Sequence, residues 1–397
     1  MQHRSGVISR RTFLGSMILA AGASAGCATA AGSNRKRSKL IGYTRYRTNL
    51  PTRFANQITM RAHVVGIDGS SPRPIAESLT AEPNSWTQFA GWTPDGRQAV
   101  IGRGWETPEN AAWEEENKTF RMTQDWLYDT YFLDMTSGNL VNLTAVERVS
   151  NYNAGIIFVP DDNNTLGFTA LINGISHPFL MDRDGRNKRD VSQGKDGFSY
   201  GFSASPDGRF IAYHKDYQVY VANKDGSEPK QIDTGNPFNF CPLWSPSGEW
   251  LMFVSGEHYN CHPTIVHPDG TGLRKLADRG GYEGVTPVID VFDFHGGSSD
   301  VPVWSIDGAS IYYTARVNDA IELMRVSVDG RIEQLTRSKP GVAHYHPKPS
   351  PDGKYLAFGS NESGPRRLYV SDLDAAEPQP ITPREEGFGA MWLHWQP

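Results

Sequence analysis

Residues 350–359 read SPDGKYLAFG, a tight polar turn followed at once by a short apolar strand. Aspartate and glycine adopt the left-handed backbone conformations that such turns require. The same unit recurs at 92–96, 158–161, 205–208, 244–248 and 304–308, and half of it stands at 395–397. A unit that returns at intervals of about 40–50 residues is typical of the blades of a β-propeller.

The apolar strand of this unit occurs seven times, at 41–44, 100–102, 166–169, 211–213, 251–253, 311–314 and 356–359. The first copy has no turn motif before it, and the last turn motif has no strand after it. The two halves complete each other, because closure by one terminal strand hides the exposed edges of the first and last sheets. We therefore predict an all-β, seven-bladed β-propeller closed by the C-terminal strand, with six blades as the alternative.

The N-terminal segment has the features of an export signal. Residues 9–14, SRRTFL, match the twin-arginine motif, and a short apolar stretch and a small-residue cleavage site follow. We predict a twin-arginine signal over residues 1–33 and a single propeller domain over residues 34–397, located in the periplasm or cell envelope. Cys27 follows a segment that resembles a lipid-attachment motif, so a lipid anchor at this residue is left open.

Composition limits the partners. The chain has 397 residues and a net charge of −5, and loss of Arg4, Arg10 and Arg11 with the signal would bring the charge to −8. Because a mildly acidic chain repels nucleic acid, we exclude that partner. We also expect the protein to be a monomer.

Beyond the signal only Cys241 and Cys261 remain, and two cysteines are too few for a disulfide framework or a zinc site. A single bridge between them is left open.

Blade topology predicts that the polar loops gather on one face of the ring. The face on which the innermost strand begins also carries the loop between the second and third strands and the connections between blades. Both long insertions, at 103–125 and 277–300, fall in such loops, and the first leaves room for a short helix. The ligand-contacting residues expected on this face are Trp105, Trp113, Tyr259, Tyr282, His295 and Tyr345.

A pair of histidines suggests a metal site on the same face. His344 and His346 are two residues apart, so in a regular strand both side chains point the same way and suit one metal ion. His258 and Asp300 would complete the ligand set at the mouth of the channel. The alternative is that one histidine packs inside the ring while the other caps a turn.

The repeat resembles that of a known family. The Ser-Pro-Asp-Gly turn and apolar strand are followed by an Asp-Gly turn, as at 329–330, and a Leu-Thr pair, as at 335–336. This order is similar to the TolB-like (WD40-like) propeller repeat and covers nearly all of residues 40–397. The resemblance specifies a fold rather than one function. It implies an exported, non-catalytic propeller that binds an envelope protein or a glycan, and this is the function we favour.

A second, partial resemblance implies a different function. The segment 344–347, HYHP, is similar to the segment of oligogalacturonate lyases that carries two manganese-binding histidines. His344 and His346 would then bind manganese or another divalent metal, and Asp300 could replace a missing histidine ligand. Gly341 stands where that family has a glutamine ligand. The alternative function is a metal-dependent lyase that cleaves anionic uronate oligosaccharides by β-elimination, with a catalytic base that the sequence does not identify.

Overall fold

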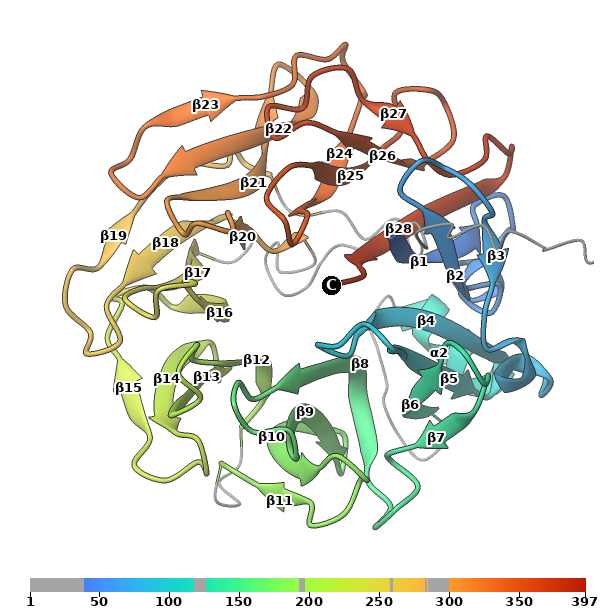
Figure 1. The fold of residues 1–397 in the computed structure, drawn as a ribbon, viewed down its shortest axis with the longest axis horizontal. Helices are drawn as coiled ribbons and strands as arrows, with labels where there is room; N and C mark the ends of the chain where they lie inside the picture. Colours follow the sequence, from blue (N-terminus) through green and yellow to red (C-terminus); the bar gives the residue numbers. More distant parts are fainter. Residues whose placement is uncertain (1–38, 118–125, 193–196, 258–259, 283, 285–299) are drawn as a thin grey trace, which may run out of the picture. The chain divides into compact units, whose positions relative to one another are not determined.

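The computed structural model describes residues 39–117, 126–192, 197–257, 260–282, 284 and 300–397. Seven four-stranded antiparallel sheets follow one another around a central axis (Figure 1). The predicted all-β, seven-bladed propeller is therefore confirmed, and the six-bladed alternative is excluded. Within the described residues, no helix is long and apolar enough to cross a membrane.

The blades are numbered along the chain, and the strands of each are given from the axis outward. Blade 1 contains β28 (Phe388–Trp395), β1 (Leu40–Arg47), β2 (Arg61–Gly66) and β3 (Arg73–Pro74). Blade 2 contains β4 (Ser85–Trp92), β5 (Gln98–Glu106), β6 (Trp126–Asp134) and β7 (Leu140–Asn142). Blade 3 contains β8 (Ser150–Phe158), β9 (Thr165–Ile172), β10 (Ile175–Asp182) and β11 (Arg189–Asp190).

The remaining four blades have the same plan. Blade 4 contains β12 (Ser199–Ala204), β13 (Phe210–Lys215), β14 (Gln218–Asn223) and β15 (Lys230–Ile232). Blade 5 contains β16 (Phe238–Trp244), β17 (Leu251–Glu257), β18 (Asn260–Val266) and β19 (Arg274–Lys275). Blade 6 contains β20 (Val303–Trp304), β21 (Ser310–Val317), β22 (Ala320–Ser327) and β23 (Ile332–Gln334). Blade 7 contains β24 (His344–Pro349), β25 (Leu356–Ser360), β26 (Arg367–Ser371) and β27 (Gln379–Pro380).

Short helices lie between some of these strands. They are α1 (Arg53–Gln57), η1 (Glu77–Thr80) and α2 (Pro108–Asn117). Helix α2 occupies the first insertion, where the sequence had left room for a helix. Arg53 of α1 lies 3.5 Å from the Glu114 carboxylate of α2, so the two helices are joined by an ion pair.

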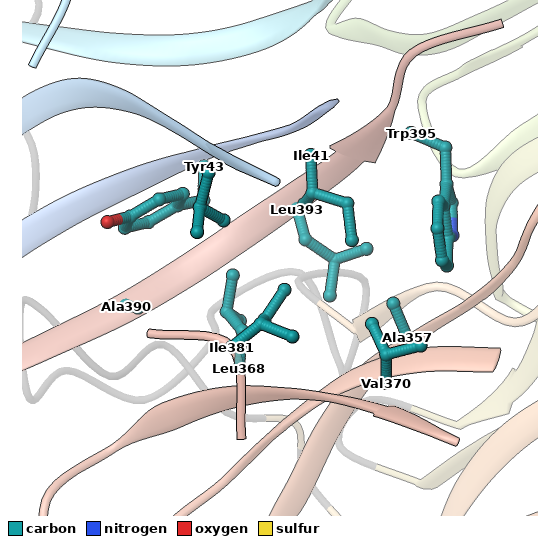
Figure 2. Close-up of a cluster of buried hydrophobic side chains, with 10 residues drawn as sticks. Ile41, Tyr43, Ala357, Leu368, Val370, Ile381, Ala390, Leu393 and Trp395 are labelled. Atoms are coloured by element: carbon teal, nitrogen blue, oxygen red, sulfur yellow. The ribbon is translucent and has the colours of Figure 1, made fainter. Parts of the chain in front are cut away.

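The two ends of the propeller meet in blade 1. Strand β28 pairs antiparallel with β1, from Ile41 opposite Trp395 to Arg47 opposite Phe388. Ile41 and Leu393 are wholly buried, and they pack with Leu368 of the neighbouring blade 7 (Figure 2). The predicted closure of the ring by the C-terminal strand is thus confirmed.

The repeated turn is stabilised by its own side chains. Ser350 Oγ donates to Asp352 Oδ1 at 2.6 Å, and Gly353 N donates to Ser350 O at 2.9 Å. Gly353 has a φ of 66°, in the left-handed region that favours glycine. Ser205 with Asp207, and Ser305 with Asp307, form the same side-chain hydrogen bond, which explains why the motif recurs.

Tryptophans at the ends of the innermost strands join neighbouring blades. Trp92 Nε1 donates to His394 O at 3.1 Å, and Trp395 Nε1 donates to Lys348 O at 2.9 Å. Trp304 Nε1 donates in the same way to Leu243 O at 3.2 Å. Each indole therefore fixes the main chain of the preceding blade near the axis.

Both described cysteines are buried free thiols. Cys241 lies on β16 and Cys261 on β18, and β17 runs between these two strands. Strands two places apart in a sheet are separated by about 10 Å, whereas a disulfide needs Cα atoms within about 7 Å. The bridge that the sequence left open therefore does not form in this fold.

We predict that Leu393→Ala destabilises the protein by about 2–5 kcal/mol, because it empties a buried position at the closure of the ring. The measurement is denaturant unfolding of the full chain. Leu273→Ala is the matched control, since Leu273 is 38% exposed, and its effect should stay within about 0.5 kcal/mol. Equal unfolding free energies for the two variants would contradict the closure contact.

Candidate functional site: the axial cavity

A cavity of about 450 Å³ lies where the innermost strands of five consecutive blades end. We call it the axial cavity. It is lined by residues of β4, β5, β8, β20, β24 and β28, which belong to blades 1, 2, 3, 6 and 7. Its aromatic walls are formed by Trp92, Phe158, Trp304 and Trp395. The volume falls within the range of small-molecule binding sites.

Two titratable side chains enter this cavity, Lys348 and His394. Lys348 Nζ lies 3.3 Å from His394 Nδ1. Lys348 remains partly accessible because it faces the cavity, although protein atoms surround it. The carbonyl oxygens of both residues accept the indole hydrogen bonds of Trp395 and Trp92, so the same two tryptophans that join the blades also position the pair.

The environment separates the protonation states of the two residues. Burial lowers the pKa of Lys348 to about 8. Burial, together with the positive charge of Lys348 and the neighbouring His346, holds the pKa of His394 well below its ordinary value. At neutral pH Lys348 is therefore protonated and His394 is neutral, so the ammonium donates its hydrogen bond to Nδ1. The pair carries one positive charge in an otherwise apolar cavity.

The structure places His344 between blades rather than in the axial cavity. The residue is 2% exposed, and its Nε2 lies 2.8 Å from Ser338 Oγ and 3.8 Å from Glu322 Oε2. Its ring also meets Phe358 edge-on. Burial lowers the pKa of His344 to about 4, with Glu322 opposing the shift. His344 is thus a packed, neutral histidine at physiological pH.

His346 lies in a bulge of the same strand. The pairing of β24 with β25 shifts between Tyr345 and Lys348, and His346 has a φ of 52°. Such a bulge re-aims side chains and interrupts the two-residue alternation of a regular strand. The spacing of His344 and His346 therefore does not by itself place both side chains together.

Asp300 is used by the fold at this point. Its Oδ1 accepts the main-chain N–H of His346 at 2.9 Å, which fixes the bulge. Its Oδ2 accepts the hydroxyls of Tyr282 at 2.8 Å and Thr314 at 2.6 Å. The carboxylate is 1% exposed. These contacts give Asp300 a structural role that needs no metal.

The structure describes only three of the four predicted metal ligands, namely His344, His346 and Asp300. No group of three or more His, Cys, Asp and Glu residues in the described part of the chain is placed to hold a metal ion. His258 lies outside the described residues, as do the predicted ligand-binding residues Tyr259 and His295. Manganese binding by His344, His346, Asp300 and His258 therefore remains a prediction.

The other predicted contact aromatics differ in their accessibility. Tyr345 is wholly buried, and its hydroxyl donates to Ala390 O at 2.7 Å. Tyr282 is 3% exposed and is hydrogen-bonded to Asp300. Trp105 on β5 and Trp113 on α2 are half-buried. The structure thus brings the two tyrosines into the interior and leaves the two tryptophans partly accessible.

Sequence reasoning missed Lys348 and His394, although a signal exists. Each precedes the first turn residue of its repeat by two positions, counted from Ser350 and Gln396. In blades 5 and 6 the equivalent position holds Leu243 and Val303. Two titratable residues in adjacent blades, at a position that is apolar in blades 5 and 6, would have indicated the axial pair.

Comparisons with known proteins agree with the fold. No family model matches the chain. The chain is 30% identical over 164 residues to the Tol-Pal system protein TolB of Bordetella pertussis. This match covers 41% of this chain and 33% of that relative. Over 181 residues, 42% of this chain and 23% of the relative, the chain is 29% identical to an uncharacterized peptidase, YuxL, of Bacillus subtilis. The matches thus span a third or less of these two relatives.

Solved structures extend the likeness to most of the propeller. An oligogalacturonate lyase in complex with manganese matches with a TM-score of 0.54 at 15% identity, over 88% of each chain. TolB from Acinetobacter baumannii matches with a TM-score of 0.51 at 15% identity, over 90% of this chain and 67% of that chain. The resemblance to TolB-like propellers and to oligogalacturonate lyases is confirmed at the level of the fold.

We predict that Lys348→Met stabilises the protein at neutral pH by about 1–2 kcal/mol. Methionine has a side chain of similar shape to lysine but lacks the charge that the fold takes out of water. The folded-state pKa of about 8 lies below the value of about 10.4 for an unfolded lysine. The gain should therefore be complete below about pH 8 and disappear as the pH rises towards about 10.4. Denaturant unfolding across this range is the measurement.

The matched control is Lys354→Met, since Lys354 is exposed on the turn that follows β24. It should show no such pH-dependent gain. A loss of stability in Lys348→Met at neutral pH would contradict the burial of an unpaired charge at this position.

Proposed function

We propose that this protein is an exported, non-catalytic propeller that binds an envelope protein or a glycan through its axial cavity. The proposal rests on the cavity. Its volume is large enough for one chemical group of a partner, and its wall, which five blades form, carries the single positive charge of the Lys348–His394 pair. Strands of the blades position most of the lining residues, including Lys348 and His394. Such preorganisation favours binding, because little ordering remains to be done when the partner arrives.

The charge of the cavity favours an anionic group of the partner. Lys348 Nζ has one hydrogen bond, to a neutral histidine, and forms no ion pair with any described residue. A buried ammonium without a counter-ion is unfavourable, and an anion that enters the cavity would offset that cost. Export is supported by the twin-arginine motif at 9–14 and by the TolB-like fold.

We predict that a photo-crosslinking residue at position 306 captures the partner in cells that export the full chain. Ile306 lines the axial cavity and is 47% exposed, whereas Ile332 on β23 is 50% exposed and lies far out in blade 6. A crosslinked species of higher mass should form from position 306 and not from position 332. The readout is the mass shift of the protein on a denaturing gel.

Dependence on Lys348 makes this experiment specific. The crosslinked species should disappear in the Lys348→Met background and persist in the Lys354→Met background. Equal crosslinking from both positions, or crosslinking that Lys348→Met leaves unchanged, would contradict binding at the axial cavity.

The alternative, a metal-dependent lyase that acts on uronate oligosaccharides, makes an opposite prediction. The binding function predicts no unsaturated uronate product from oligogalacturonate with added manganese, followed by ultraviolet absorbance. Retained manganese together with product formation, both lost in His344→Ala and kept in His267→Ala, would establish the lyase instead. His267 is a suitable control because it stacks on Trp250 at the outside of blade 5.

A further inference from the structure

Building on the binding function proposed above, we infer that the axial cavity recognises an apolar carboxylate: one carboxylate group on a hydrocarbon body with few or no hydroxyl groups. The inference rests on the distribution of polar groups over the wall of the cavity. That distribution separates apolar acids from the hydroxylated acids of anionic oligosaccharides.

The wall offers one charged donor and little else. Apart from Lys348 and His394, the described residues that line the cavity are Ala, Gly, Val, Ile, Phe, Pro and Trp. The three lining tryptophans already donate their indole N–H groups, to His394 O, Leu243 O and Lys348 O. Among the described residues of the wall, only the side chains of Lys348 and His394 therefore have a hydrogen bond to give to a ligand.

This wall discriminates between two kinds of acid. A carboxylate can accept a charge-assisted hydrogen bond from Lys348 Nζ, which keeps donors beyond the one directed at His394. A hydrocarbon body gains free energy against Trp92, Phe158 and Trp304. The hydroxyls of a uronate would instead lose water without finding side-chain partners, and each such loss costs about 1–3 kcal/mol. The cavity thus fits an apolar acid.

One residue supplies the charge of this wall. Among the described residues that line the cavity, Lys348 of β24 and His394 of β28 are the titratable ones, and those of β4, β5, β8 and β20 add none. The Lys348 ammonium therefore provides the attraction for the carboxylate.

Four small probes test the inference by calorimetric titration into the full chain. N-acetyl-leucine carries an apolar body and a carboxylate, and hexanoate carries both without a peptide group. N-acetyl-leucinamide lacks the charge, and galacturonate adds hydroxyls. We expect N-acetyl-leucine or hexanoate to bind at least about tenfold more tightly than the amide and the uronate.

Variants locate the site. Lys348→Met should weaken binding of the apolar acids by about tenfold or more, and Lys354→Met should leave it unchanged. Tighter binding of N-acetyl-leucine than of hexanoate would identify the chain end of a polypeptide as the source of the carboxylate. The reverse order would identify a free carboxylic acid.

Several results would overturn the inference. They are equal binding of the amide or of galacturonate, no binding of either apolar acid, or binding that Lys348→Met does not weaken. Its failure is distinguishable from failure of the proposed function. If crosslinking at position 306 still requires Lys348 while no apolar acid binds, the binding function stands and the ligand class is wrong. If that crosslinking is also absent, both are wrong.

Discussion

The pairing of β28 with β1 is the interaction on which the rest of the structure depends. It joins the two ends of the propeller in one sheet and gives blade 1 its innermost strand. The same strand carries His394 and Trp395 to the axis, so the axial cavity exists only in the closed ring. Contacts between residues so distant in sequence carry the largest loop-closure cost, and this one must therefore be offset by the buried cluster around Leu393.

One repeated feature of the fold also positions the site. The tryptophan before the turn hydrogen-bonds the main chain of the preceding blade in three places. In two of them the carbonyl belongs to Lys348 or to His394. Between Trp304 and Leu243 this hydrogen bond only joins two blades. Two blades further on, the same kind of hydrogen bond, from Trp395 to Lys348, also holds one residue of the charged pair in place. The geometry of the pair therefore follows from blade packing and needs no additional loop.

The sequence predicted the fold because its local chemistry repeats. The serine–aspartate hydrogen bond of the turn recurs at Ser205, Ser305 and Ser350, and a left-handed glycine follows it in each copy. The site was less predictable, because it depends on register between blades. The positive φ of His346 interrupts the strand alternation that the two histidines imply. The carboxylate oxygens of Asp300 accept hydrogen bonds from that bulge and from two hydroxyls, contacts that the sequence alone does not show.

The strongest argument for function at the axis is that the Lys348–His394 pair makes the free energy of folding less favourable. Leu243 and Val303 show that the equivalent position accepts an apolar residue in this fold. A lysine there is largely surrounded by protein atoms and has no carboxylate partner among the described residues, which destabilises the folded state below about pH 8. Structural ion pairs do not explain it, since its described hydrogen-bond partner is a neutral histidine. Perturbed titratable groups in a cavity are typical of binding and catalytic sites. A ligand that supplies the missing negative charge turns this unfavourable arrangement into affinity.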